Sequence, residues 1–271
     1  MKKYNFTKMV ASGNDFIILN YGLRITDYGL RNLSVQLCDR KYGIGADGVL
    51  VLGKSRAADI RMRIFNADGS EAEMCGNGAR CAALYARSRI RKEKLSIETK
   101  AGIIQACVKA DRVKIRLTDP KGIKLNIPLK INGRALKVNF VDTGVPHAVI
   151  FVNGIDGIDV LALGRRIRHH QAFAPRGANV NFVEIAKDNF IRVRTYERGV
   201  EDETLACGTG SVASALITDY RLRITDYGFM NIKTQGGEVL KVYYSRCGNI
   251  FRDVWLEGKA KRVFEGVVRI P

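Results

Sequence analysis

The sequence predicts an α+β fold made of two pseudo-symmetric domains, and three observations support this prediction. The string Cys-Gly-x-Gly begins at Cys75 and again at Cys207, 132 positions later in a chain of 271 residues. Each copy follows an alternating strand pattern and an acidic loop, and each precedes an apolar helix pattern. Most of the remaining chain consists of short strand patterns, and Asp-Pro-Lys-Gly at 119–122 separates two of them. We therefore expect a domain boundary near 119–122.

The first residues predict a hairpin, a helix and a short buried strand. Alternating side chains favour strands over 4–9 and 16–19, and the turn between them presents Asn14. Leucines at helical spacing favour a helix over about 27–40. A short apolar run then predicts a buried strand over 49–52. From these residues alone Asn14 could be only a turn former, since asparagine tolerates tight backbone angles.

Cys75 lies where a strand pattern at 60–64 and an acidic loop lead into a run of alanines. The alanines predict a buried helix, so the thiol stands at a helix N-terminus with glycines beside it. Backbone N–H groups and the helix dipole favour negative charge there, and such positions lower the pKa of cysteine thiols. Cys75 is therefore a candidate acid/base group. The alternative is a small core residue in front of an alanine-rich helix.

The same periodicities predict the other elements. Strands are expected over 95–99, 103–109, 113–117, 136–140, 179–185, 191–195, 229–234, 239–244, 254–256 and 263–270, and helices over 158–163 and after Cys207.

Two thiols in equivalent places suit one class of reaction. To invert a carbon centre, one group must remove a proton from one face while another returns a proton to the opposite face. Cys75 and Cys207 are a matched pair for those two roles, one from each half of the chain. No motif for an aldehyde cofactor is evident, so we expect no cofactor.

The net charge of +18 is the strongest argument for a different function. Nucleic-acid binding would use such a charge. However, the basic residues are spread along the chain, and the densest runs, 87–94 and 165–168, carry no interleaved aromatic residues. A solvated basic surface is the simpler interpretation, and we expect neither a nucleic-acid nor a membrane partner.

The cysteines favour a reducing compartment. Six cysteines without the dense spacing of a disulfide scaffold fit a cytoplasmic protein. No apolar run approaches the ~18 residues of a membrane helix, and the first residues lack a signal-peptide core. Cys75 with Cys81 does not form a Cys-x-x-Cys pair, and His169-His170 has no partners at zinc spacing, so we expect no metal.

At this point the chain resembles the diaminopimelate epimerase family. Five strings resemble family motifs in the right order: Ser12-Gly13-Asn14-Asp15-Phe16, Gly43-Ile44-Gly45-Ala46-Asp47-Gly48, Asn66-Ala67-Asp68-Gly69-Ser70 leading to Cys75-Gly76-Asn77-Gly78, Gly177-Ala178-Asn179-Val180-Asn181-Phe182, and Tyr196-Glu197-Arg198-Gly199 leading to Cys207-Gly208-Thr209-Gly210. The two cysteine strings are highly specific, and the resemblance covers most of the chain.

The resemblance implies the rest of the expected architecture. Each domain is a mixed, mostly antiparallel sheet or barrel wrapped around a central helix, with the active site in the cleft between the domains. The last strand returns to the first domain, so the expected domains are 1–118 with 259–271, and 119–258. The resemblance also implies a homodimer and a small amino-acid substrate.

The resemblance implies roles for particular residues. The catalytic residues would be Cys75, Cys207, His147 and Glu197, and the substrate-binding residues would be Asn14, Asn66, Gly76, Asn77, Asn179, Glu197, Arg198, Gly208 and Thr209. Bland alternatives remain for some of them: His147 as a hydrogen-bonded core histidine, and Glu197 with Arg198 as a surface ion pair.

Two positions depart from the family pattern. The family often carries a substrate-facing Gln where this chain has Gly48, and commonly an Asn before the Pro-His pair where this chain has Val145. The implied activity is interconversion of LL- and meso-diaminopimelate. A racemase of another amino acid, such as histidine, is the main alternative, and a basic nucleic-acid-binding protein on the same scaffold is the second.

One repeat has no place in the two-domain symmetry. The seven residues 23–29 recur identically as 222–228, at an offset of 199 positions. The first copy precedes a helix pattern and the second a strand pattern. We assign this repeat no function.

Overall fold

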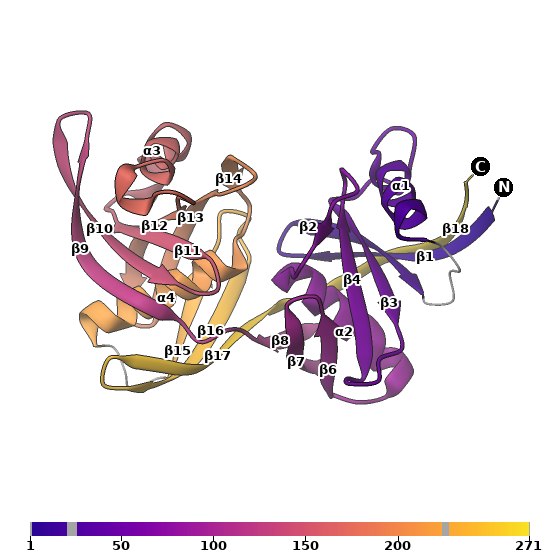
Figure 1. Cartoon of the computed structure of the whole chain (residues 1–271). Helices are drawn as coiled ribbons and strands as arrows, with labels where there is room; N and C mark the ends of the chain where they lie inside the picture. The colour runs from indigo at the N-terminus through magenta and orange to yellow at the C-terminus, as the bar shows by residue number, and fades with distance from the viewer. Residues whose placement is uncertain (1, 21–25, 224–227, 271) are drawn as a thin grey trace. The chain divides into compact units, whose positions relative to one another are not determined.

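A computed structural model describes residues 2–20, 26–223 and 228–270 and forms two compact units. Unit 1 consists of 1–115 with 258–271, and unit 2 of 116–257 (Figure 1). The sequence analysis placed the boundaries slightly later, after 118 and after 258. The last strand therefore belongs to the unit in which the chain begins.

Unit 1 is one curved sheet with a helix on each face. Its strands are β1 (Lys2–Ala11), β2 (Asn14–Asn20), β3 (Gly48–Gly53), β4 (Ile60–Asn66), β5 (Glu71–Ala72), β6 (Lys94–Thr99), β7 (Gly102–Lys109), β8 (Arg112–Arg116) and β18 (Lys261–Ile270). They pair in the order β18-β1-β2-β3-β4-β6-β7-β8, with β5 also on β4. Only β2–β3 and β4–β6 are parallel among these pairs.

The two helices of unit 1 cover opposite faces of this sheet. Helix α2 (Gly76–Ile90) packs against β1, β2, β3, β4, β6, β7 and β18, and its alanines are buried. Alanine allows this close approach because it has the smallest side chain that still favours a helix. Helix α1 (Asp27–Cys38) packs on β3 and β4 through Leu30, Leu33 and Leu37. The sheet is thus wrapped around α2, as expected.

Unit 2 repeats this plan. Its strands are β9 (Lys121–Ile131), β10 (Arg134–Asp142), β11 (Pro146–Phe151), β12 (Asn179–Lys187), β13 (Phe190–Glu197), β14 (Asp202–Thr204), β15 (Phe229–Lys233), β16 (Val239–Cys247) and β17 (Ile250–Lys259). Its helices are α3 (Val160–Arg168), α4 (Gly208–Leu222) and the 3₁₀ turns η1 (Ile155–Gly157) and η2 (Gln171–Phe173). Helix α4 packs on β10, β11, β12, β13, β15 and β16, whereas α3 packs on the other side of β12 and β13.

The pairing order of unit 2 confirms the predicted pseudo-symmetry. The order is β9-β10-β11-β12-β13-β15-β16-β17, and β11–β12 and β13–β15 are its parallel pairs. These pairs correspond to β2–β3 and β4–β6 of unit 1. Strand β9 is an element that the sequence analysis did not predict, although Ile123, Leu125, Ile127, Leu129 and Ile131 alternate along it with exposed residues. Only Leu129 among them is fully buried.

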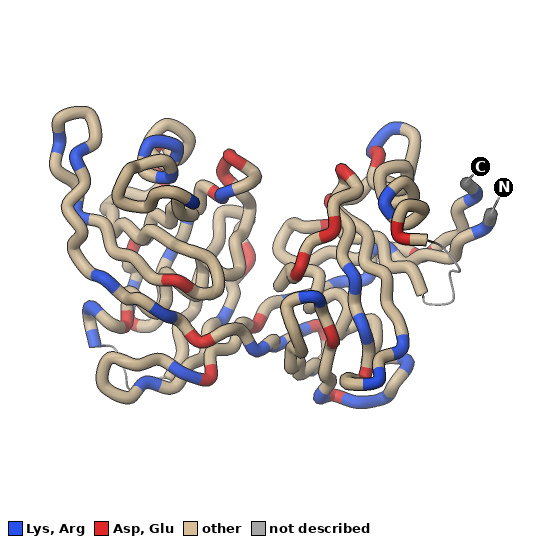
Figure 2. Tube along the Cα trace, viewed as in Figure 1, with Lys and Arg blue, Asp and Glu red and all other residues tan. Residues whose placement is uncertain are grey.

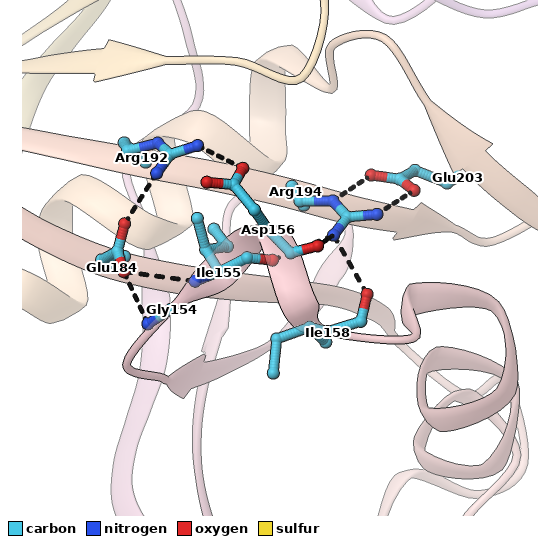
Figure 3. Close-up of polar contacts among 8 residues, drawn as sticks. All are labelled: Gly154, Ile155, Asp156, Ile158, Glu184, Arg192, Arg194 and Glu203. Carbon is cyan, nitrogen blue, oxygen red and sulfur yellow. Dashed lines mark hydrogen bonds and ion pairs between the residues drawn. The ribbon is translucent and has the colours of Figure 1, made fainter.

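Both units hold their short acidic strand with the same ion pair. In unit 1, Arg63 on β4 donates two hydrogen bonds to Glu71 on β5, at 2.8 and 3.1 Å. In unit 2, Arg194 on β13 donates two to Glu203 on β14, both at 2.7 Å, and also binds the carbonyls of Ile155 and Ile158 at 2.9 and 3.0 Å (Figure 3). A bidentate pair fixes the position of each acidic strand, which leads to the cysteine.

We predict that Arg194→Lys lowers the free energy of unfolding by about 2 kcal/mol. Hydrogen bonds to charged groups contribute about 1.5–3 kcal/mol, and lysine cannot reach two carboxylate oxygens and two carbonyls together. The control is Arg192→Lys on the same strand, because Arg192 is more exposed and pairs with Asp156 and Glu184 (Figure 3). Urea unfolding measures both. Equal losses in the two variants would contradict a special role for Arg194.

The repeated segment is only partly described. Residues 23–25 and 224–227 lie outside the described residues. The described end of the first copy enters α1, where the Thr26 hydroxyl caps the helix by accepting from the Gly29 N–H. The second copy precedes β15, so the helix and strand expected after the two copies are both present.

Candidate active site

Each predicted thiol is the N-cap of the helix at the centre of its unit. Cys75 has extended backbone angles, and its Sγ accepts from the Gly78 N–H at 3.4 Å. The first bond of helix α2 runs from the Ala79 N–H to the Cys75 carbonyl, at 2.8 Å. The N–H groups of Gly76 and Asn77 precede this bond, so the helix itself provides them with no acceptor.

Cys207 repeats this geometry in unit 2. Its Sγ accepts from the Gly210 N–H at 3.4 Å and lies 3.5 Å from the Thr209 hydroxyl. The first bond of α4 joins the Ser211 N–H to the Cys207 carbonyl, at 2.9 Å. The N–H groups of Gly208 and Thr209 are therefore equivalent to those of Gly76 and Asn77. Each unit offers a thiol and two backbone donors at one helix N-terminus, an arrangement that attracts anions.

The structure brings Asn14 and Asn77 together beside Cys75. The Asn14 side-chain carbonyl accepts from the Asn77 side-chain amide, and the Asn14 amide donates to Asp47 at 3.1 Å. Asn77 in turn accepts from Arg80, at 2.7 Å. These bonds fix the orientation of both asparagine side chains at the thiol end of α2.

A charged cluster holds the loops on which Asn14 lies. Asp15 bonds to Arg40 at 2.9 and 3.2 Å and pairs with Lys8 at 2.8 Å, and Arg40 also binds Asp47 at 2.8 Å. Burial raises the pKa of Asp15, but the bonds from Arg40 and Lys8 outweigh it and lower the pKa to about 2. Asp15 therefore remains charged at any physiological pH, and the Asn14 turn stays anchored.

Gly48 begins β3 and Asn66 ends β4, so the two residues lie at the same end of these neighbouring strands. They are register partners on β4 and β3, and Asn66 is exposed with its amide on the Ser70 hydroxyl at 2.9 Å. A Cβ added to Gly48 would lie 2.8 Å from the Phe65 carbonyl oxygen. The backbone thus excludes a glutamine here unless it shifts.

In unit 2, Asn179, Glu197 and Arg198 gather where β12 begins and β13 ends. The Asn179 side-chain oxygen accepts from the Arg198 backbone N–H at 2.8 Å, and the side-chain amide nitrogen donates to the Pro146 carbonyl at 3.3 Å. Glu197 accepts from the Thr204 hydroxyl at 2.9 Å, and burial raises its pKa. Asn179 therefore fixes the backbone that carries Arg198, and Glu197 has the raised pKa that suits proton transfer.

His147 on β11 is fully buried and is held neutral by its surroundings. Its Nδ1 lies 3.1 Å from the amide nitrogen of Asn181. Burial, together with the charge of Arg198, lowers the pKa of His147 to about 3. Its Nε2 is buried and has no hydrogen-bond partner among the described residues.

We predict that His147 makes the protein lose stability in mild acid. Its pKa is about 3 in the folded chain and near 6.5 when unfolded, so only the unfolded chain takes up its proton between these values. The loss begins as pH falls below about 6.5, grows by about 1.4 kcal/mol per pH unit and levels off below about 3. Urea unfolding from pH 7 to 5 should show it.

The matched variant for this prediction is His147→Phe, because phenylalanine occupies the equivalent position, Phe16, in unit 1. This variant should lose stability less steeply than the wild type between pH 6.5 and 5. Parallel slopes would mean that His147 is not the group responsible.

Three comparisons with known proteins bear on this arrangement. A family model described as diaminopimelate epimerase matches residues 6–122 and 139–254. The chain belongs to the diaminopimelate epimerase family. A diaminopimelate epimerase of Hydrogenobaculum sp. strain Y04AAS1 is 43% identical, with 97% of each chain covered. One of Methanocella arvoryzae is 40% identical, covering all of this chain and 98% of the relative.

Solved structures of differently named proteins have this fold. A Bacillus anthracis phenazine biosynthesis protein of the PhzF family matches with a TM-score of 0.74, at 20% identity over the full length of both chains. A hydroxyproline epimerase from Agrobacterium vitis matches with a TM-score of 0.70, at 16% identity, over 98% of this chain and 92% of that one. At such identities the likeness shows only that this chain has the same fold as these proteins.

Three further observations concern metal sites, membrane helices and the distribution of basic residues. Among the described residues, no group of three or more His, Cys, Asp or Glu side chains could hold a metal ion, and no helix is long and apolar enough to cross a membrane. Lys and Arg are spread over strands and loops of each unit (Figure 2). In this member of the diaminopimelate epimerase family, the candidate catalytic groups are Cys75 and Cys207, at the N-termini of α2 and α4.

The sequence analysis did not identify the residues that hold His147 and Asn14 in place. Asn181 and Thr195 carry the hydrogen bonds beside His147, and Asp47 and Arg40 anchor Asn14. One signal was available: Asn181 stands inside an otherwise apolar strand run, where a buried amide needs partners. The others come from distant strands and loops, so local patterns contain no trace of the contacts.

Proposed function

We propose that the chain interconverts LL- and meso-diaminopimelate without a cofactor, with Cys75 and Cys207 as the two acid/base groups. The observation that carries the proposal is the matched pair of N-cap cysteines, each with two backbone donors beside it, in a member of the diaminopimelate epimerase family. One thiol is deprotonated and the other protonated at the start of each turnover.

The proposed reaction moves one proton on and one proton off the same carbon. The thiolate removes the α-proton. The electron pair of the broken C–H bond stays on the carbon, and this carbanion is delocalised into the α-carboxylate. The other thiol then gives its proton to the opposite face. The product has the inverted configuration, and the two thiols have exchanged protonation states. The mechanism therefore needs both thiols at one α-carbon, and each unit contributes one.

The backbone donors would hold the carboxylate as its charge grows. These are the N–H groups of Gly76, Asn77, Gly208 and Thr209 at the two helix starts. Removing one donor of this kind costs about 2.7–4 kcal/mol in enzymes where an oxyanion is bound. Stabilising the carbanion is the main difficulty of the reaction. Because the proposed reaction uses no cofactor, these backbone donors would provide that stabilisation.

The polar residues around each thiol would recognise the remaining groups of the substrate. Asn14 and Asn66 would bind it from unit 1, and Asn179, Glu197 and Arg198 from unit 2. A guanidinium suits a bidentate contact with a carboxylate, and the raised pKa of Glu197 suits a proton relay to Cys207. We assign His147 a supporting role at the same thiol.

A racemase of another amino acid remains the second candidate. It is favoured by Val145 and Gly48, where the family pattern has polar residues, and by the backbone contact that excludes a side chain at Gly48. This candidate keeps both thiols and changes only the contacts to the far end of the substrate.

Proton NMR in D2O tests the proposal. Reduced protein is incubated with LL-diaminopimelate, with histidine and other amino acids in parallel. Deuterium at the α-carbon together with the meso isomer is the expected result. Exchange confined to another amino acid would support the second candidate, and exchange in no tube would overturn both.

We also propose that the enzyme is a cytoplasmic homodimer. The family resemblance supports the dimer. The absence of a disulfide-scaffold pattern among the six cysteines supports the cytoplasm. Light scattering on a sizing column should give about twice the 30.1 kDa of one chain. A mass equal to one chain would overturn the dimer.

A further inference from the structure

Unit 2 contains a buried polar chain of three side chains that unit 1 lacks. His147, Asn181 and Thr195 lie on the adjacent strands β11, β12 and β13 and are at most 3% exposed. Their neighbours Ala148, Phe182 and Tyr196 belong to the apolar cluster under α3. Because side chains alternate along a strand, the three polar groups face the α4 side of the sheet.

The hydrogen bonds of Asn181 determine which way its amide points. The amide nitrogen donates to the Ala148 carbonyl at 3.0 Å, and the amide oxygen accepts from the Thr195 hydroxyl at 3.0 Å. A carbonyl can only accept, so the nitrogen must lie on that side. The second hydrogen of the same nitrogen is directed to His147 Nδ1, at 3.1 Å.

This orientation determines the tautomer of His147. Nδ1 accepts a hydrogen bond, so it carries no proton. A neutral imidazole must then carry its proton on Nε2. That N–H is buried, and no described residue accepts from it.

The same positions of unit 1 are apolar. Phe16, Leu50 and Ile64 stand in unit 1 where His147, Asn181 and Thr195 stand in unit 2, by the strand registers. Leu50 lies under Gly78, just as Asn181 lies under Gly210. The fold therefore does not need the polar chain, and burying it costs free energy that the apolar residues do not. A function in unit 2 is the remaining reason for it.

The polar chain adjoins the Cys207 end of α4. A Cβ placed on Gly210 would lie 2.3 Å from the Asn181 amide oxygen and 3.2 Å from the Cys207 sulfur. Asn181 and the thiol thus flank the same glycine. Gly210 has no side chain because the amide occupies that space.

We propose that Asn181, held by Thr195, is a positioning residue that keeps His147 as the neutral Nε2-protonated tautomer, so that His147 serves the Cys207 half-site as a hydrogen-bond donor and not as a base. The role in catalysis rests on the proposed function, whereas the tautomer does not. No described residue accepts from this buried N–H, and the acceptor that we assign to it is a negatively charged group of a bound amino acid.

Nitrogen NMR of the imidazole rings tests the tautomer directly. The chain has three histidines, and His169→Gln and His170→Gln identify the signals of His147. In the wild type between pH 5 and 8, we expect an unprotonated Nδ1 and a protonated Nε2. A proton on Nδ1 would overturn the proposal.

Two substitutions of Asn181 separate positioning from packing. Asn181→Asp places a carboxylate where the amide donated, so the proton should move to Nδ1 and the pH profile of kcat should gain a titration. Asn181→Leu copies unit 1 and should leave the tautomer mixed. In both, kcat should fall about 100-fold with a smaller change in KM.

The matched control is Asn139, another buried asparagine of unit 2 with backbone partners, at 3% exposure. Asn139→Asp should lower stability and leave the His147 tautomer unchanged. If Asn181→Asp behaved like Asn139→Asp, the proposal would be wrong. If the wild-type tautomer were as expected but no amino acid exchanged its α-proton, the positioning would stand and the proposed function would fail.

Discussion

Cys75→Ala and Cys207→Ala should each lower the rate of epimerisation about 10³-fold. General acid/base groups contribute about 10²–10⁴-fold, and each cysteine is assigned one of the two proton transfers. Each variant should still fold, because the bond from the Gly78 or Gly210 N–H to the cysteine sulfur is long and weak, and its loss at the N-cap costs little. The measurement is the appearance of the second isomer by proton NMR, with unfolding in urea to verify the fold.

Cys81→Ala is the control for these variants. Cys81 lies on the same helix as Cys75 but is fully buried, and burial raises its pKa far above the ordinary thiol value. It should therefore be inert, and its variant should keep full activity. If the double variant Cys75→Ala/Cys207→Ala still produced the second isomer, the two-thiol mechanism would have to be abandoned.

Gly210→Ala should lower activity about 100-fold and stability by about 2 kcal/mol. The added methyl would lie 2.3 Å from the Asn181 amide oxygen, which bonds to Thr195 and cannot simply rotate away. Overpacking of this kind costs about 1–3 kcal/mol. The methyl would also crowd the Cys207 sulfur, so both groups of the half-site move. Urea unfolding and the NMR assay measure the two effects.

Gly78→Ala is the symmetry-matched control. There the tightest contact of the added methyl is a methyl group of Leu50, at 3.1 Å, and a leucine end can shift by a few tenths of an ångström. The Cβ of Cys75, at 3.6 Å, is at an ordinary contact distance. Alanine also favours a helix over glycine by about 1 kcal/mol. Stability should therefore change by less than ~1 kcal/mol. If both alanines cost the same, the amide of Asn181 would not be the cause.

The features predicted from sequence are those that short segments encode. The alanine run after Cys75 specifies a buried helix, and the glycines beside the cysteine specify its start. Asn14 was expected in the turn of a hairpin and lies at its end, with positive φ at Ser12 and Gly13. The repeat of the cysteine string predicted the two-unit architecture, because each copy needs the same sheet around it.

The features missed depend on contacts between distant segments. Asn14 bonds to Asp47, 33 positions away, and to Asn77, and the partner of His147 is Asn181, 34 positions away. Periodicity reports which side of a strand is buried but not which buried groups meet. The backbone carbonyl that excludes a side chain at Gly48 is likewise invisible in the sequence, since it belongs to β4.

The pairing of β1 with β18 has a consequence for the order in which the chain folds during synthesis. Strand β1 is synthesised long before β18, so one edge of β1 stays open until all the strands between them have been made. In unit 2 the corresponding partners β9 and β10 are neighbours in a hairpin and can pair as soon as they emerge. The half translated second should therefore complete its sheet first. Open strand edges attract other chains, so the nascent first half is the part that a chaperone has most reason to protect.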